Sequence, residues 1–239
     1  MDEEDARTQE TALAYARANK RAIAERIADP DVYIAEECPV SLFMAGSPGA
    51  GKTEASKALI KEVGGTVLRI DPDDLRGEFG DYNGGNAWLF QGAISVLVDR
   101  IVDVALKLHQ SFLLDGTLTN YEKAKQNVER SLKRHRPVQV FYVYQDPRQA
   151  WEFVQDRESL EGRHIALETF VRQYFEARKV VNCLKNEFGS SIKVDLLLKN
   201  LDGSRRFAKS NIDQIDNHVP EKYDPHTLLE LLRSQDLRC

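Results

Sequence analysis

The sequence predicts an α/β fold in which helices cover both faces of a central, mainly parallel sheet. Short apolar runs alternate along the chain with longer stretches of helical periodicity, and this is the order that right-handed βαβ units require. With 239 residues, of which 42% are hydrophobic, the chain is long enough for one such domain with additions. Ligands of these sheets bind beyond the carboxyl ends of the strands, so residues at those ends are the first candidates for function.

Residues 1–39 predict a helical extension that precedes the main domain. A helix is expected from about residue 5 to residue 29, because small and apolar residues recur on one face of it, and a turn around Pro30 ends it. The members of this face are Ala12, Ala16, Ile23 and Ile27.

The main domain is expected over residues 40–239. Apolar and β-branched runs predict its strands, and a spacing of three or four between apolar residues predicts its helices. Its first half reads as a strand at 40–45, a helix at 52–63, a strand at 66–70, a helix with an apolar face from Phe90 to Leu108 and a strand at 111–115. Its second half reads as a helix at 120–135, a strand at 138–144, helices at 147–157 and 165–185, a strand at 192–199 and two weaker helices at 206–214 and 225–233.

Charge and composition exclude several classes of protein. A net charge of −5 argues against a bulk nucleic-acid binder, and no apolar run approaches the roughly 20 residues that span a bilayer. The acidic start, Met1 to Asp5, is no secretory signal, so a cytoplasmic location without a membrane partner is expected. Cys38, Cys183 and Cys239 are scattered, as are the five histidines, which predicts reduced thiols and no structural metal.

One loop carries the most chemical information. The segment Gly46-Ser47-Pro48-Gly49-Ala50-Gly51-Lys52-Thr53 lies between the first strand and the first helix of the main domain, which is the arrangement of a phosphate-binding P-loop. Its glycines let backbone N–H groups curl around phosphates, while Lys52 can reach the β- and γ-phosphates and Thr53 can hold Mg²⁺. The motif predicts ATP and Mg²⁺ as ligands, with Lys52 as a catalytic residue.

Two acidic residues follow the second strand. Asp71 and Asp73 lie where a P-loop kinase binds its acceptor, and such an enzyme needs a carboxylate that orients the attacking hydroxyl and accepts its proton. Asp71 precedes Pro72, which is typical of a helix N-cap with proline at the first helical position. We assign Asp71 to the cap and Asp73 to catalysis and acceptor binding, with the reverse as the alternative.

The third strand ends in Asp115-Gly116-Thr117. An acid at this point, beside the P-loop strand, can hold Mg²⁺ through water or fix the acceptor. Gly116 leaves room for a substrate to approach closely. Helix capping by Asp115 is the structural alternative.

Two arginines follow the fourth strand. Arg157 and Arg163 flank a polar turn, and arginines from a mobile lid at about 157–165 would neutralise charge on the transferring phosphoryl group and exclude water. Surface salt bridges are the alternative explanation of this pair. The predicted architecture is thus a three-layer, P-loop kinase-like fold with a lid segment.

Taken together, these motifs resemble the zeta-toxin family of P-loop kinases. The resemblance spans roughly Val40 to Lys199 and rests on the loop 46–53, on Ile70-Asp71-Pro72-Asp73 and on Leu114-Asp115-Gly116-Thr117. It implies that Asp73 is the catalytic base, that Asp115 and Thr117 contact the acceptor and that Arg157 and Arg163 hold ATP phosphates. The family's best-known members have glutamate where this chain has Asp115.

The resemblance also implies an acceptor and a partner. The family's best-known members phosphorylate the 3′-hydroxyl of the sugar in UDP-N-acetylglucosamine, and relatives act on other nucleotide metabolites such as NAD. Contacts to a nucleotide sugar are expected from the turn 82–86, which holds Asn83, and from Gln91. Toxic members are blocked by a helical antitoxin protein that covers the nucleotide site, so the helix at 5–29 either packs on the sheet or acts as an inhibitor in cis.

Two other functions remain open at this stage. A partner-stimulated regulatory ATPase would transfer phosphate to water, but Asp73 lies at the acceptor position. A polynucleotide 5′-hydroxyl kinase would need a basic channel, and the acidic chain offers only the helix near 120–136 to build one. Its basic residues are expected to form a solvated face: Lys123, Lys125, Arg130, Lys133, Arg134 and Arg136.

Overall fold

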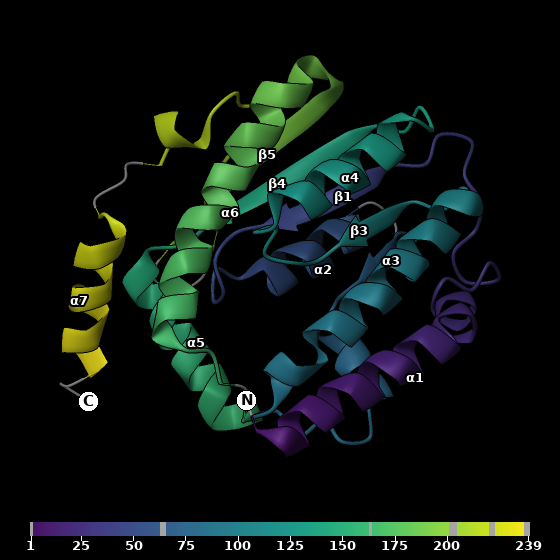
Figure 1. The fold of residues 1–239 in the computed structure, drawn as a ribbon. Helices are drawn as coiled ribbons and strands as arrows, with labels where there is room; N and C mark the ends of the chain where they lie inside the picture. The colour runs from purple at the N-terminus through teal and green to yellow at the C-terminus, as the bar shows by residue number, and fades with distance from the viewer. Residues whose placement is uncertain (1, 63–65, 163, 201–204, 220–222, 237–239) are drawn as a thin grey trace.

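The computed structural model describes residues 2–62, 66–162, 164–200, 205–219 and 223–236. Within these residues, six strands form one sheet in the order β2-β3-β1-β4-β5-β6 (Figure 1). Strands β1 to β5 run parallel, and β6 pairs antiparallel with β5 at the edge of the sheet. The strands are β1 Ser41–Ala45, β2 Leu68–Ile70, β3 Phe112–Leu114, β4 Val138–Tyr144, β5 Ile192–Lys199 and β6 Arg205–Lys209. The predicted mainly parallel sheet is therefore confirmed.

Helices cover both faces of this sheet, as predicted. Side chains alternate between the faces of a strand, so Phe43 joins the large core under α3, α4 and α6, while Leu42 and Met44 pack towards α2. Figure 1 shows α1 outside α3 and the pair α5 and α7 beside α6. The helices are α1 Glu3–Ile27, α2 Lys52–Glu62, α3 Gln91–Lys107, α4 Tyr121–Leu132, α5 Pro147–Glu161, α6 Leu167–Phe188 and α7 Pro225–Asp236.

The amino-terminal helix α1 packs on α3 and not directly on the sheet. A capping box starts it, because Asp5 donates its N–H to Asp2 Oδ1 at 2.8 Å and Asp2 donates back to Asp5. Small buried residues such as Ala12 and Ala16 let the two helices approach closely. Since α1 shares the main hydrophobic core, it is part of the folded body, and the proposed boundary at residue 39 stays a prediction.

One expected helix is wrong. Residues 206–214 were expected to be helical, but Arg205–Lys209 form β6, in which Ala208 pairs with Leu197 of β5. Strand β6 begins six residues after Lys199, the last residue of β5. The open edge of β5 offers backbone hydrogen-bond partners to this segment, and they outweigh its weak helical pattern. The other weak helix is confirmed as α7.

The expected solvated face of α4 is wrong at one position. Arg136 is only 3% exposed. Its Nε donates to Ser41 Oγ at 2.9 Å, and Nη2 donates to the carbonyl oxygens of Val40 at 2.9 Å and Gln110 at 2.5 Å. The guanidinium also lies 5.2 Å from the centre of the Phe112 ring. Arg136 thus joins the amino ends of β1, β3 and β4 and is not available to a nucleic acid.

Candidate active site

The loop between β1 and α2 has the backbone shape of a phosphate cradle. Gly46 and Gly49 have φ angles of +139° and +70°, in the region that favours glycine. A Cβ on Gly46 would lie 2.3 Å from the Val143 carbonyl oxygen, and one on Gly49 would lie 2.0 Å from that of Ala150. The loop is therefore wedged against the end of β4 and the first turns of α5, where only glycine fits.

The charged end of this loop lies at the start of α2. Lys52 Nζ donates to the Ser47 carbonyl oxygen at 2.7 Å, so the ammonium group lies across the loop. Thr53 follows it in the first turn, where free N–H groups and the helix dipole attract anions. These donors fit the phosphate groups of a triphosphate, and the hydroxyl oxygen of Thr53 is of the ligand type that Mg²⁺ accepts.

The end of β3 holds the most connected carboxylate of the site. Asp115 Oδ2 accepts hydrogen bonds from Ser56 Oγ at 2.6 Å and from Arg69 Nε and Nη2 at 3.0 and 2.7 Å. Ser56 Oγ also lies 3.0 Å from the Thr53 carbonyl oxygen, which places Asp115 about one helical turn from Thr53. Because three donors occupy Oδ2, a metal ion would reach this side chain through Oδ1 or through water.

The same arginine also contacts the acids that follow β2. Arg69 pairs with Asp71 through Nη2 and with Asp74 through Nη1 at 2.9 Å. Burial lowers the pKa of Arg69, but the hydrogen bond to Asp115 and the charges of Asp71, Asp115 and Asp74 outweigh burial and leave this pKa raised. Arg69 and Ser56 are site residues that the sequence motifs do not include. The available signal was an arginine between the apolar residues Leu68 and Ile70 in a short strand.

Asp71 does not cap a helix as expected. The 3₁₀ helix that follows spans Asp74–Glu78, and its N-cap residue is Asp73. Asp71 Oδ1 instead accepts the Asp73 N–H at 2.8 Å, which closes a tight turn. Burial raises the pKa of Asp71, while the Asp73 N–H and Arg69 oppose this. The Asp71 carboxylate therefore stabilises a turn with the Asp73 N–H and does not cap the following helix.

Asp73 has a different environment from that of Asp71. Its side chain is 34% exposed, against 8% for that of Asp71. Its Oδ1 lies 3.1 Å from Nη2 of Arg76, whose side chain is only 6% exposed. Arg76 in turn lies 5.8 Å from the centre of the Tyr82 ring. The structure thus presents Asp73 at the surface of the site and keeps Asp71 inside it.

Three further candidate residues lie at different distances from this centre. Thr117 is next to the phosphate loop, because its carbonyl oxygen accepts the Gly46 N–H at 3.3 Å. Asn83 lies in an exposed turn, where it exchanges hydrogen bonds with Asn86, and Gln91 is exposed at the start of α3. Within the described residues, no hydrogen bond joins Asn83 or Gln91 to the loop or to the acids.

The expected lid is partly helical. Helix α5 continues four residues beyond its expected end, so Arg157 lies within it and is exposed. Arg163, like Cys239, lies outside the described residues. A hydrophobic cluster of its own, in which the rings of Trp151 and Phe170 are 5.1 Å apart, joins α5 to α6 and α7. The helix that carries Arg157 therefore packs separately from the main core.

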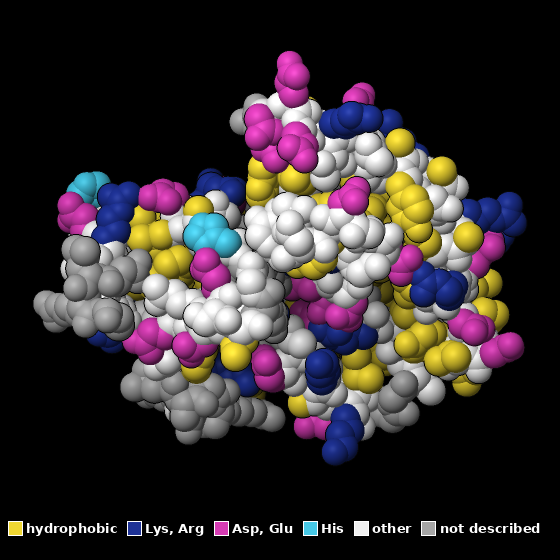
Figure 2. All heavy atoms as spheres, turned by 90° about the horizontal axis from the view of Figure 1, so that it is seen from below, with side chains coloured by type: hydrophobic (Ala, Val, Ile, Leu, Met, Phe, Trp, Pro, Cys, Tyr) yellow, Lys and Arg dark blue, Asp and Glu magenta, His cyan; other side chains and the backbone are white. Residues whose placement is uncertain are grey.

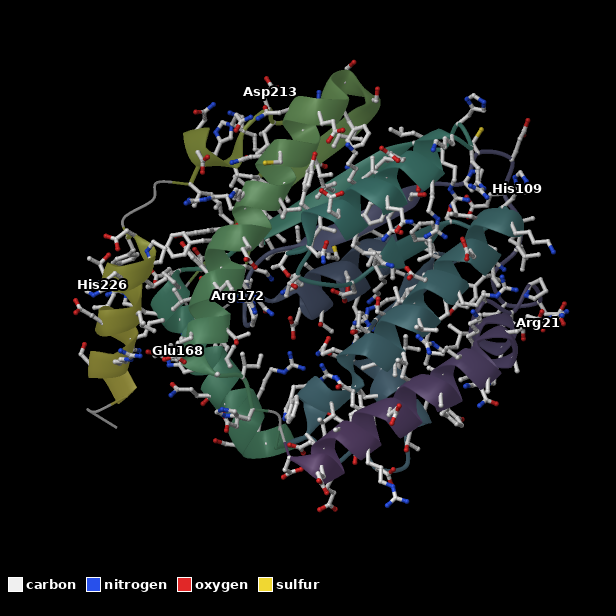
Figure 3. All side chains as sticks on the ribbon, viewed as in Figure 1. Arg21, His109, Glu168, Arg172, Asp213 and His226 are labelled. Atoms are coloured by element: carbon white, nitrogen blue, oxygen red, sulfur yellow. The ribbon has the colours of Figure 1, made fainter. Side chains whose placement is uncertain are left out.

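The distribution of charged side chains and histidines bears on the kind of site that is possible. Acidic and basic side chains lie together near the middle of the face shown in Figure 2. Across the described ranges, no three His, Cys, Asp or Glu residues group as metal ligands, and His109 and His226 lie on opposite sides of the molecule (Figure 3). No described helix is both long and apolar enough to cross a membrane.

Comparison with known families gives one match that covers most of the chain. The profile of the family described as "Zeta toxin" matches residues 24–213. The match begins within α1 and ends beyond β6, so it includes the phosphate loop and both acidic segments. No curated protein sequence matches the chain.

Solved structures share the fold at low sequence identity. One comes from the PezAT chromosomal toxin-antitoxin system of Streptococcus pneumoniae, with 16% identity, a TM-score of 0.63 and coverage of 92% of this chain and 96% of the other. Another is the AvrRxo1-ORF1:-ORF2 complex with ATP, with 16% identity, a TM-score of 0.58 and coverage of 95% and 71%. A third is the Pnkp1/Rnl/Hen1 RNA repair complex, with 15% identity, a TM-score of 0.52 and coverage of 80% and 54%.

Proposed function

Because the chain belongs to the zeta toxin family, we propose that it is an ATP- and Mg²⁺-dependent kinase that acts as the toxin of a toxin-antitoxin pair. One observation carries this proposal. The glycine-rich loop with Lys52 across it lies at the same edge of the sheet as a partly exposed carboxylate, Asp73. A triphosphate donor and a hydroxyl acceptor can therefore meet there.

The proposed reaction is the transfer of one phosphoryl group. The acceptor hydroxyl oxygen attacks the γ-phosphorus, the bond from that phosphorus to the β,γ-bridging oxygen breaks, and ADP leaves with the electron pair. Asp73 orients the hydroxyl and takes its proton late in the transfer. In this role the carboxylate must be ionised and accessible, and Asp73 is more accessible than Asp71.

The other proposed site residues bind the ATP phosphates and neutralise their charge. The backbone of residues 46–51 and Lys52 bind the phosphates. Thr53, and Asp115 through water, would hold a Mg²⁺ ion, which would supply further neutralisation of the phosphate charge. Arg157 and Arg163 are proposed to bind the phosphates from the α5 side when the lid closes.

The proposed acceptor is a nucleotide sugar, with UDP-N-acetylglucosamine first. Asn83, Gln91 and Thr117 are the proposed contacts to it, together with Asp73 and Asp115. Family membership supports this choice, and a kinase of another nucleotide metabolite such as NAD is the alternative. A partner-stimulated ATPase is the second alternative, and it predicts ATP turnover without any phosphorylated small molecule.

One experiment tests the kinase and identifies the acceptor. The purified chain is incubated with ATP, Mg²⁺ and a panel of nucleotide sugars and dinucleotides, and each acceptor is examined by mass spectrometry for the gain of one phosphate. We expect phosphorylation of a nucleotide sugar, and ATP turnover that rises when this acceptor is added. Turnover that rises only with a partner protein would instead favour the regulatory ATPase.

The toxin role is tested separately in cells. We propose a cytoplasmic protein that is held inactive by an antitoxin protein, as the family suggests. Helix α1 packs on α3 as part of the folded body, which supports a separate antitoxin over inhibition by α1 itself. Expression of the chain alone in bacteria should stop growth, while expression of the Lys52→Ala variant should not. Normal growth with an active, soluble kinase would contradict the toxin role.

A further inference from the structure

Arg69 is the basic residue with the largest number of acidic contacts in the described part of the site. Its side chain is 15% exposed and contacts three carboxylates from two segments of the chain: Asp71 and Asp74 after β2, and Asp115 after β3. Strand pairing places Arg69 opposite Leu113, two residues before Asp115. The backbone of two adjacent strands therefore brings this one cation and these acids together.

From these contacts we propose that Arg69 is the positioning residue of the acceptor side. It holds Asp115 and Asp71 in fixed orientations, so that Asp73 is the carboxylate presented to the acceptor hydroxyl. The inference rests on the proposed kinase function and names a residue that the motifs of the sequence do not include.

The geometry explains why an arginine is needed here. Arg69 donates to Asp115 Oδ2 through both Nε and Nη2. It also donates to Asp74 through Nη1 and to Asp71 through Nη2. A planar guanidinium can bind in several directions at once, whereas a lysine ammonium is a single point of charge on a flexible chain. Without this cation, the side chain of Asp115, which is only 3% exposed, would keep Ser56 as a neutral partner. A buried carboxylate that loses its cationic partner turns toward other donors, so the orientation of Asp115 would change.

The first test is a kinetic comparison of Arg69→Met and Arg69→Lys with Arg17→Met, a matched change of an exposed arginine on α1. For Arg69→Met we expect kcat to fall about 30-fold or more, while the dissociation constant of Mg·ATP changes less than about threefold, because the phosphate loop is untouched. Arg69→Lys should recover part of the kcat, and Arg17→Met should match the wild type. An unchanged kcat in Arg69→Met would overturn the inference.

A double variant keeps the test decisive if Arg69→Met folds poorly. Arg69→Met combined with Asp115→Asn removes both charges of this pair, so it should fold, and its loss of kcat should be smaller than the product of the two single losses. Losses that multiply would mean that the two residues act independently, which would contradict the inference.

A third measurement needs no acceptor. The Asp71 carboxyl is followed by NMR titration of protein labelled at aspartate, and its pKa should be higher in Arg69→Met than in the wild type, because Arg69 now opposes the effect of burial. An unchanged titration would overturn the inference even if the kinase activity is real. A wild-type protein that binds no ATP would overturn the proposed function instead.

Discussion

Two largely buried arginines lie at opposite ends of the same sheet, and their partners differ. Arg69 lies within β2, and its side chain contacts the carboxylates that follow the carboxyl ends of β2 and β3. Arg136, at the amino ends of β1, β3 and β4, is bound by two carbonyl oxygens and one hydroxyl. Arg69 neutralises carboxylates that lie in the candidate site, whereas Arg136 donates hydrogen bonds to backbone carbonyl oxygens of Val40 and Gln110.

The pKa values of the two arginines reflect these partners. Burial lowers the pKa of Arg136 to about 10, and the charge of Glu36 opposes this only in part. For Arg69, three carboxylates more than offset burial and raise the pKa. Dense pairing of opposite charges is thus found at the edge of the sheet where ligands of α/β folds bind, and neutral partners are found at the other edge. The comparison predicts that changes at the carboxyl edge alter activity and that changes at the amino edge alter stability.

The largest effect on activity is expected from Lys52→Ala. Without the ammonium group, the β- and γ-phosphates lose a positioned cation, so transfer should fall by about 10³-fold or more. Stability should hardly change, because the lysine is only partly buried. Kinetics and thermal unfolding measure the two quantities, with Lys57→Ala on the exposed side of α2 as the matched control. Full transfer activity in Lys52→Ala would rule out the phosphate-binding role of the loop.

Arg136→Met should have the opposite profile. It leaves the Val40 and Gln110 carbonyl oxygens without this donor in a buried place, and each such loss costs about 1–3 kcal/mol. We expect the free energy of unfolding to fall by about 3 kcal/mol in denaturant titrations, while kcat per folded molecule stays constant. Arg134→Met, at an exposed neighbouring position, is the control. A loss of kcat at unchanged stability would contradict the structural role of Arg136.

Asp73→Asn tests which acid is the base. The change keeps the shape of the side chain, so ATP binding should persist while kcat falls by about 10²-fold, within the usual range for a positioned base. Calorimetry and initial rates measure the two effects, and Asp81→Asn in an exposed turn serves as the control. If Asp71→Asn gives this loss and Asp73→Asn does not, the two roles are reversed.

The smallest expected effect is a pH dependence of stability. Burial raises the pKa of Asp71, so the folded protein binds this proton more tightly than the unfolded chain does. The resulting stabilisation is complete below the ordinary aspartate pKa and is lost as the pH rises through the raised value. In urea unfolding, the free energy of unfolding of the wild type minus that of Asp71→Asn should therefore fall as the pH rises from 3 to 7. Identical curves would contradict this assignment.

Much of the fold could be predicted because its signals are local. The strand at 138–144 was expected at the residues where β4 lies, since all residues of this run except Gln139 are aromatic or β-branched. The helix at 206–214 was wrong because pairing with β5 outweighed a weak propensity. The boundary of α5 was also misplaced, since residues 158–161 hold a single apolar residue, Leu160, which gave no apolar spacing by which to extend the helix.

The candidate site divides in the same way. The phosphate loop is contiguous in sequence, so its glycines, Lys52 and Thr53 could be found by spacing, and their roles stay predictions. Arg69 could not be found in this way, because its meaning depends on Asp115, 46 residues further on. The burial of Arg136 was missed for the same reason. A basic residue at the end of a charged helix is expected to be solvated, and its burial here depends on the distant segments at the starts of β1 and β3.

The sequence by itself determined the order of strands and helices as far as β5, the phosphate loop and the acidic segments, because each of these depends on residues that are near one another in the chain. Only the tertiary structure decided which acid is enclosed and which is presented, and which arginine serves the reacting edge of the sheet. These properties depend on burial and on partners from distant segments, and charge pairing of that kind exists only after the strands have come together.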